Sequence, residues 1–368
     1  MVERVSRGAL AGLLTVLVAA AVVAPDVTAE PSRKKSIWGP VERDGASQFP
    51  LYRELGVGIL QMSIAWNTAA PTRPAEPADP ADPAYRWPPE VDRAIAAGAR
   101  HGIAVSLLLN GTPAWANGGR DSTRAPRRAR DFADFTAAAS RRYPAVRHWM
   151  IWGEPSKVSR FQPLVPAMGR RLSARQRRGP RHYARILDAS YAALKRVNRR
   201  NLVIGGNTWT GGEVVPLNFI RAMRLPNGRR PRMDLYGHNP FTLRTPRLSR
   251  TPSAYGHADF SDLDTLAGWL DRHGYRDRRG RPLRLFLSEL SIPTDHANFE
   301  FNFWVTRETQ ARWLRAALRI TRRWRRIYTL GYLGLYDDPP RPDGREVNRG
   351  LITFDGRRKP AFRAFREG

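Results

Sequence analysis

Residues 90–110 have the sequence EVDRAIAAGARHGIAVSLLLN, which contains a helical pattern, a stop signal and an apolar strand in direct succession. The helical pattern covers Glu90–His101. Gly102 follows it, and glycine at this position favours the left-handed conformation that ends many helices. The strand predicted over Ile103–Asn110 is almost continuously apolar, as are parallel strands that are covered on both faces. This stretch therefore predicts a helix followed by one strand of a parallel sheet.

The same alternation of helical patterns and short apolar runs recurs along the chain at intervals of roughly 30 to 50 residues. Eight strands are predicted, at Ser36–Gly39, Gly58–Trp66, Ile103–Asn110, Val146–Trp152, Leu202–Asn207, Asp234–His238, Leu283–Glu289 and Tyr328–Tyr336. Six helices are predicted between them, at Glu90–His101, Asp131–Tyr143, Tyr183–Asn198, Leu217–Arg224, Asp262–His273 and Glu308–Arg326. This order favours an α/β fold with a single (β/α)8 TIM barrel over a doubly wound sheet.

The N-terminus has the pattern of a secretory signal peptide. Arginines precede an uninterrupted apolar run at residues 9–24, and residues 27–29, Val-Thr-Ala, offer a cleavage site of small side chains. We expect residues 1–29 to be removed and residues 30–368 to form the barrel domain outside the cytoplasm. An uncleaved membrane anchor is the alternative, although the apolar run is short for a membrane span.

The composition excludes several classes of protein and of site. The chain has 368 residues, of which 42% are hydrophobic and none is cysteine, so collagen, coiled coil and general disorder are excluded. The lack of cysteine excludes disulfides, thiolate zinc sites, iron–sulfur clusters and thiol nucleophiles. The seven histidines form no H-E-x-x-H motif, and no P-loop, G-x-G-x-x-G or G-x-S-x-G motif is in its required context. We therefore predict neither a metal nor a cofactor.

The charge is strongly basic, with 62 Lys and Arg residues against 33 Asp and Glu residues, a net charge of +29. The arginines occur in short clusters throughout the chain, such as those at 127–130 and 322–326, rather than in one tail. Such runs are usually solvated surface, and a GC-rich coding sequence would produce them without any binding role. No nucleic acid partner is expected. Electrostatic association with an anionic cell envelope is a further hypothesis.

The segment 71–89 contains seven prolines in nineteen residues and cannot form a helix or a central strand. It follows the second predicted strand, so in a barrel it lies on the face where active sites are built. Two interpretations stay open, a loop that contacts a ligand and a stiff surface excursion that does not.

Two glutamates each end a strongly apolar strand. Glu154 lies in WMIWGEPS, residues 149–156, and Glu289 lies in LFLSELS, residues 285–291. Carboxylates at these positions would point into the mouth of the barrel, and such a pair is what glycoside hydrolysis requires. The alternative is that each glutamate forms an ion pair with a neighbouring arginine.

Five segments in this order resemble those of retaining glycoside hydrolases of clan A, closest to families 39 and 5, which include β-xylosidases and cellulase-like enzymes. They are residues 85–117 around the second helix and third strand, WMIWGEP at 149–155, MDLYGHNPF at 233–241, LFLSEL at 285–290 and GLITFDGRRKPAFRAF at 350–365. The resemblance implies a retaining enzyme that cleaves O-glycosidic bonds of a poly- or oligosaccharide without a cofactor, and the predicted signal peptide implies that it is secreted. It does not identify the sugar or the linkage.

The resemblance makes Glu154 the general acid/base and Glu289 the nucleophile. Glu154 then needs a raised pKa, which desolvation by Trp152 and repulsion from Glu289 would supply. Glu289 must stay ionised and needs hydrogen-bond donors. The candidate donors are Tyr236, His238 and Tyr336. In a retaining site the two carboxyl groups lie about 5–5.5 Å apart.

Aromatic, amide and imidazole side chains near the predicted mouth are candidates for binding the sugar, because flat rings suit pyranose faces and amides read hydroxyl groups. They are Trp66, Asn110, Trp115, Trp152, Asn207, Trp209, His238, Asn239 and Tyr336. The alternative for the aromatic residues is ordinary barrel packing. His238 alone would more often be a hydrogen-bonded core residue.

One departure from the family pattern bears on activity. Gly153 stands where the clan usually has the asparagine that holds the sugar 2-hydroxyl, a contact that strengthens in the transition state. Either Asn207, Asn110 or a water replaces it, or the substrate differs at that position. The further alternative is a non-catalytic barrel that only binds glycans.

Overall fold

The computed structural model describes residues 30–167, 172–248 and 255–368. Eight parallel strands form a closed barrel in chain order. The strands are β1 (Ser32–Trp38), β4 (Val57–Ala65), β5 (Ala104–Asn110), β6 (His148–Ile151), β7 (Leu202–Trp209), β8 (Leu235–Asn239), β9 (Arg284–Leu290) and β10 (Ile327–Leu333). The predicted α/β barrel is therefore confirmed, with all eight strands near their predicted positions.

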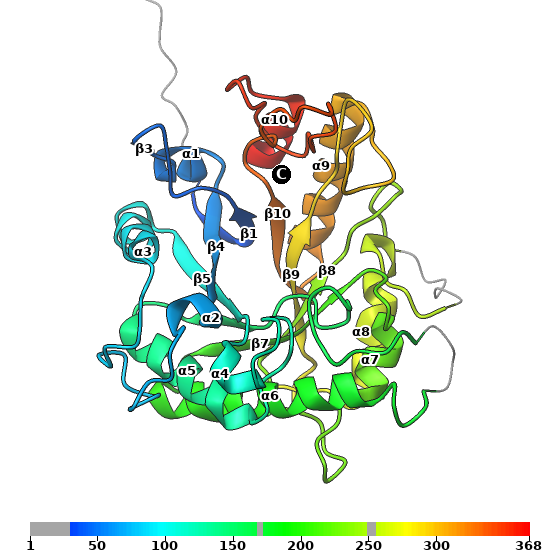
Figure 1. Ribbon diagram of the computed structural model, residues 1–368. Coiled ribbons are helices and arrows are strands. Elements are labelled where there is room, and N and C mark those ends of the chain that lie inside the picture. The colour runs from blue at the N-terminus through cyan, green and yellow to red at the C-terminus, as the bar shows by residue number, and fades with distance from the viewer. Residues whose placement is uncertain (1–29, 168–171, 249–254) are drawn as a thin grey trace, which may run out of the picture.

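Helices surround the barrel, with α3 on one side and α8 and α9 on the other (Figure 1). The six predicted helices are confirmed as α3 (Pro89–His101), α5 (Ala129–Arg142), α6 (Arg178–Val197), α7 (Pro216–Ala222), α8 (Leu263–Arg272) and α9 (Arg307–Arg323). Gly102 ends α3 with a φ of 70°, as predicted for a left-handed stop. Its backbone N–H then donates to the Gly98 carbonyl, which satisfies one of the last carbonyls of the helix.

Several short elements were not predicted from the sequence. They are the hairpin β2 (Glu42–Arg43) and β3 (Ala46–Ser47), the helices α1 (Phe49–Glu54), α2 (Trp66–Ala69) and α4 (Ala114–Asn117), and the 3-10 turn η1 (Phe260–Asp262). The helix α10 (Pro360–Glu367) lies at the end of the tail segment that resembles the clan's segment after strand eight and its closing helix. Trp66 was predicted to end a strand, but it begins α2. Four-residue helices carry too few positions to show a helical period, so an apolar residue after a strand resembles its continuation.

One apolar residue from each of seven strands forms a cluster of its own, separate from the core between the strands and the helices. The cluster consists of Ile59, Leu108, Met150, Ile204, Leu235, Phe286 and Tyr328. These side chains fill the inside of the barrel, which makes it a packed core rather than a channel. Binding sites must therefore lie at its two ends.

Hydrogen bonds join the first strand to the last helix. The ammonium of Lys35 in β1 donates to the carbonyls of Phe365 and Arg366, 2.8 and 2.9 Å away, at the C-terminal end of α10. A cation at this end of a helix satisfies carbonyls without intrahelical partners and complements the helix dipole. Figure 1 shows α10 beside α9, and both lie near the strands that join the ends of the barrel.

The proline-rich segment 71–89 folds back on itself. Trp87 Nε1 donates to the Pro80 carbonyl at 2.9 Å, and the Trp87 ring stacks on Tyr85 with centroids 4.7 Å apart. Trp87 also stacks on Phe135 of α5 at 6.1 Å. These contacts fit the interpretation of a stiff excursion packed on a neighbouring helix.

The predicted signal peptide, residues 1–29, lies outside the described residues. None of the helices in the described part of the chain has the length and apolar character needed to cross a membrane.

Candidate active site

The two glutamates lie at the same end of the barrel. Glu154 follows the last residue of β6 by three positions, and Glu289 is the penultimate residue of β9. In barrel order β6 is the fourth strand and β9 the seventh. Because all eight strands are parallel, their carboxyl ends form one mouth, and functional residues of such barrels sit at this end.

The backbone beside Glu154 takes up an uncommon conformation. Trp152, Glu154 and Asn207 have φ values of 63°, 47° and 42°, in the left-handed region that side chains other than glycine rarely occupy. Residues held in this way concentrate at functional sites, because the surrounding structure must offset their strain. Asn207 helps to hold the turn, since its Nδ2 donates to the Trp152 carbonyl at 2.7 Å.

The Glu154 carboxylate has polar and charged partners on both oxygens. Asn239 Nδ2 donates to Oε1 at 3.1 Å, while Lys157 Nζ lies 3.1 Å from Oε2. Arg160 Nε is 3.9 Å from the same oxygen. Lys157 also lies 4.7 Å from the centre of the Trp209 ring, which fixes that ammonium between an aromatic face and the carboxylate.

Glu289 is partly buried, and its surroundings differ from those of Glu154. Burial raises its pKa to about 8; repulsion from Glu154 adds to the rise, whereas the charges of Arg160 and Lys157 oppose it. Among the described residues no donor forms a hydrogen bond with its carboxylate. The two carboxyl groups therefore influence each other, but the raised pKa belongs to Glu289, which was predicted to be the ionised group.

The predicted donors for Glu289 are occupied elsewhere. Tyr236 Oη shares a hydrogen bond with Thr208 at 3.1 Å, and Tyr336 Oη donates to Gln48 Oε1 at 2.7 Å. His238 Nε2 lies 2.8 Å from the Ala258 carbonyl, and its Nδ1 lies 2.9 Å from Thr208 Oγ1.

Burial lowers the pKa of His238 to about 4, so its ring is neutral and donates from Nε2 to the Ala258 carbonyl. His238 is fully buried. It is thus a hydrogen-bonded core residue rather than a sugar contact, which corrects the prediction.

A pocket of about 290 Å³ opens beside Gly153. Asn110, Trp152, Arg160 and Asn67 contribute to its lining. Of the replacements considered for the missing asparagine, Asn110 shares this pocket with Gly153, whereas Asn207 is 2% exposed and uses its amide nitrogen on the Trp152 carbonyl. A Cβ on Gly153 would lie 3.2 Å from Leu108 Cδ2, so a side chain there needs only a small shift of a methyl group.

Two predicted sugar-binding tryptophans belong to the core. Trp66 and Trp152 are each 1% exposed. The Trp66 ring contacts Trp115, Phe132 and Phe135 with centroids 5.2, 5.5 and 5.7 Å apart. Trp152 packs on Phe132 and on Phe161, and its Nε1 donates to the Arg160 carbonyl at 2.9 Å. Neither ring offers a face to a sugar in this structure, which corrects the prediction for both.

The other candidates are spread over the mouth. Trp115 and Trp209 are half-buried, and Asn239 contacts Glu154 as described above. Tyr336 is also half-buried but lines a different, shallower pocket together with Arg43. The structure therefore places Asn239 on Glu154, Trp209 against its partner Lys157 and Asn110 in the pocket beside Gly153, and it leaves Tyr336 apart.

Sequence reasoning missed Lys157 and Arg160, the two cations beside Glu154. Nothing distinguishes them from the other basic residues of the chain except their place just after the glutamate in the loop that follows β6. Among the residues that the structure describes, no group of three or more His, Asp or Glu side chains is placed to hold a metal ion.

No family model matches the chain, and no curated protein matches it by sequence. Among solved structures it is similar to a family 39 glycoside hydrolase from Bacteroides cellulosilyticus WH2, with a TM-score of 0.65 and 18% identity over 92% of this chain and 63% of that one. The monomeric β-xylosidase of Caulobacter crescentus CB15 is similar with a TM-score of 0.60 and 17% identity, over 92% of this chain and 69% of that chain. The fold is that of family 39 glycoside hydrolases. The resemblance expected from the motifs is thus confirmed for the fold.

A more distant structural relative is β-glucuronidase 2 of Bacteroides uniformis, covalently bound to cyclophellitol-6-carboxylate aziridine. Its TM-score is 0.56 at 12% identity, over 91% of this chain and 35% of that one. The present chain spans less than two thirds of the length of the family 39 protein from B. cellulosilyticus.

Proposed function

We propose that the protein is a retaining glycosidase in which Glu289 is the nucleophile and Glu154 the general acid/base. The observation that carries this proposal is the placement of both carboxyls at one mouth, after the fourth and within the seventh strand, close enough for Glu154 to raise the pKa of Glu289. The fold shared with family 39 glycoside hydrolases supports it.

In the first step the Glu289 carboxylate attacks the anomeric carbon while Glu154 gives its proton to the departing glycosidic oxygen. The products are a glycosyl ester on Glu289 and a free alcohol. In the second step Glu154 takes a proton from water, and the hydroxide attacks the same carbon and releases Glu289.

The chemistry needs one proton on the pair, and this proton must be on Glu154. In the structure the proton favours Glu289, because burial raises the pKa of that carboxyl and no donor that the structure describes contacts it, whereas Glu154 has Lys157 and Asn239 as partners. A sugar hydroxyl that donates to Glu289 would stabilise its anion and move the shared proton to Glu154.

The second candidate is a barrel that binds glycans without turnover. Two observations support this second candidate: the ion pair between Glu154 and Lys157 and the missing side chain at Gly153.

An aryl β-glycoside panel separates the two candidates. It comprises the xyloside, glucoside, arabinoside and mannoside, and a glucuronide because Lys157 and Arg160 would attract a carboxylate. The chain is compared with Glu154→Gln, Glu289→Gln and the exposed control Glu308→Gln. We expect turnover of at least one glycoside, a loss of about 100-fold or more in each site variant, and no change in the control.

No turnover of any glycoside, together with glycan binding that survives both site substitutions, would support the binding barrel instead.

We also propose secretion by cleavage after residue 29, which N-terminal sequencing of the exported protein tests. A mature chain that starts at Glu30 supports it, whereas an intact N-terminus in the membrane fraction indicates the anchor.

A further inference from the structure

A second pocket, of about 630 Å³, lies at the end of the barrel opposite the candidate active site. It is formed where strands begin, by Leu202 of β7, Leu235 of β8, Arg284 of β9 and Lys34 near the start of β1. In a parallel barrel the starts of the strands lie away from the mouth that holds Glu154 and Glu289. This basal pocket is therefore separate from the proposed chemistry.

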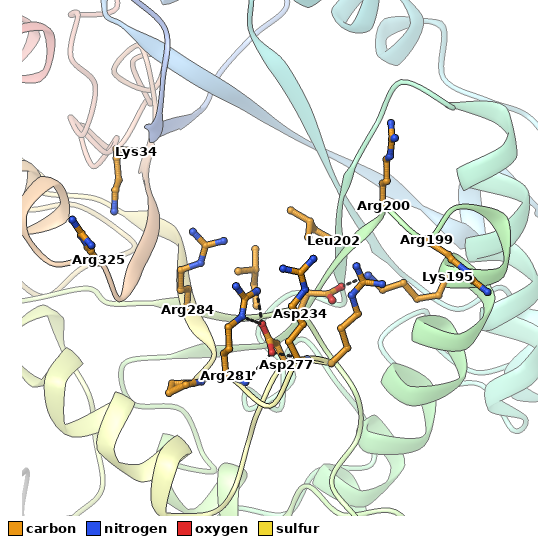
Figure 2. A pocket seen from close by; sticks show the side chains of 14 residues that line it. Lys34, Lys195, Arg199, Arg200, Leu202, Asp234, Asp277, Arg281, Arg284 and Arg325 are labelled. Carbon is orange, nitrogen blue, oxygen red and sulfur yellow. Dashed lines mark hydrogen bonds and ion pairs between the residues drawn. The ribbon is translucent and has the colours of Figure 1, made fainter.

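The basal pocket is lined by nine basic and only two acidic side chains, which leaves a net charge of +7. Both carboxylates are already paired, Asp234 with Lys195 at 2.7 Å and Asp277 with Arg281 at 2.8 Å. In Figure 2 Lys34, Arg284 and Arg325 lie on one side of Asp234 and Asp277, and Lys195 and Arg199 lie on the other.

Six further arginines line the pocket. None of them has a carboxylate of residues 30–167, 172–248 or 255–368 within ion-pair distance. They are Arg199, Arg200, Arg278, Arg279, Arg284 and Arg325. They come from three separate parts of the chain: after α6, from the loop before β9 to the first residue of β9, and before β10. The fold thus gathers charges that are distant in sequence and leaves them uncompensated.

The positive charge of the pocket affects the pKa of Lys34. Burial lowers its pKa, and the neighbouring Arg284 guanidinium lowers it further by repulsion. The Lys34 ammonium donates to the Ile327 carbonyl, so its polar contact is to a neutral group rather than to an anion. An anion bound in the pocket would relieve this repulsion.

We propose that the basal pocket binds a ligand with several clustered phosphate groups. The volume of the pocket suits one small ligand, so a ligand that neutralises the net charge of +7 must carry many negative charges in a small space. A phosphate monoester carries about −1.5 to −2 charges at neutral pH, whereas a sugar carboxylate carries one charge on each ring. Guanidinium groups also match the oxygens of a phosphate with paired hydrogen bonds.

Calorimetric titration of the full chain with inorganic tripolyphosphate tests the proposal. The first variant is Arg278→Gln with Arg279→Gln, both exposed in the loop before β9, and the second is Arg199→Gln with Arg200→Gln. The control is Arg315→Gln with Arg319→Gln, which removes the same charge from the exposed side of α9. Melting temperatures of all three check that the variants fold.

We expect tripolyphosphate to bind at one site and each pocket variant to weaken it by about tenfold or more. The control should change the affinity by less than about twofold, and raising the salt from about 0.1 M to 1 M should weaken binding by the wild type. A linear polyphosphate that competes for the site would indicate a polymer as the source of the phosphates, whereas competition only by short oligophosphates would indicate a small ligand.

Three results would overturn the proposal. One is the absence of binding by the wild type. Another is an equal loss in the control variant, which would show a general effect of surface charge. The third is preference for an oligogalacturonate or a single-stranded oligonucleotide over tripolyphosphate, because a carboxylate or phosphodiester ligand would then explain the pocket.

Discussion

Replacing Gly153 by asparagine should raise kcat/KM for the best aryl glycoside by about 30-fold. A regained hydrogen bond to the 2-hydroxyl that strengthens as charge develops contributes about 2 kcal/mol, and each 1.36 kcal/mol corresponds to about tenfold in rate. The backbone permits the change, since Gly153 is not in the left-handed region and its added Cβ would meet only Leu108 methyl groups, at 3.2 and 3.8 Å.

The steric cost of the substitution falls on stability rather than on rate. Moving the Leu108 methyl group by a few tenths of an ångström costs about 1 kcal/mol of the free energy of unfolding. Chemical denaturation measures this cost, and steady-state kinetics on the glycoside and its 2-deoxy analogue measures the gain. Gly153→Ala is the control, because it adds the Cβ without the amide.

The gain should appear for the glycoside with a 2-hydroxyl and be absent for the 2-deoxy analogue and for Gly153→Ala. An unchanged or lower kcat/KM in a folded Gly153→Asn protein would refute the reasoning. It would mean that Asn110, which lines the same pocket, or another group already holds the 2-hydroxyl, or that the substrate has none.

Three further predictions follow from the geometry. Because the pair needs one proton and loses it with the pKa of Glu289, which is raised to about 8, kcat/KM should fall as the pH rises through that region. Lys157→Met should move this fall to higher pH, since Lys157 lowers the pKa of Glu289; an unmoved pH profile would contradict this. Trp66→Ala should lower the free energy of unfolding by about 3–5 kcal/mol and leave KM unchanged, since the ring lies in the core; a raised KM with little loss of stability would instead indicate a sugar contact. Lys359→Met should lower the free energy of unfolding by about 3–5 kcal/mol, because the Asp337 carboxylate, with 3% of its side chain exposed, loses its cation at 3.0 Å. Adding Asp337→Asn should recover part of that loss in denaturation experiments. No recovery would refute the explanation.

The barrel could be predicted because each of its strands is marked by a local pattern in the sequence. Segments such as 103–110 are apolar runs of strand length that end at glycine or polar residues, and the helices between them show a helical period. The short helices α2 and α4 could not be found in this way. Their residues adopt helical conformation through packing, as the contacts of Trp66 with Phe132 and Phe135 show.

The positions of the two glutamates could also be predicted, because a residue that follows a parallel strand lies at the mouth of the barrel. Their surroundings could not. Lys157 reaches Glu154 only through the conformation of one loop, and His238 is neutral because the folded chain buries it. The pKa of a carboxyl depends on such contacts, so the raised pKa of Glu289 could not be predicted from the sequence.

Trapping of the glycosyl-enzyme tests the central claim, that Glu289 forms a covalent intermediate, most directly. The chain is incubated with an activated 2-deoxy-2-fluoro glycoside of the sugar preferred in the panel, and intact-mass and peptide mass spectrometry follow. We predict one added sugar on the peptide that contains residues 285–290, and none in Glu289→Gln. Turnover of the parent glycoside without an adduct, or an adduct on another residue, would contradict the account.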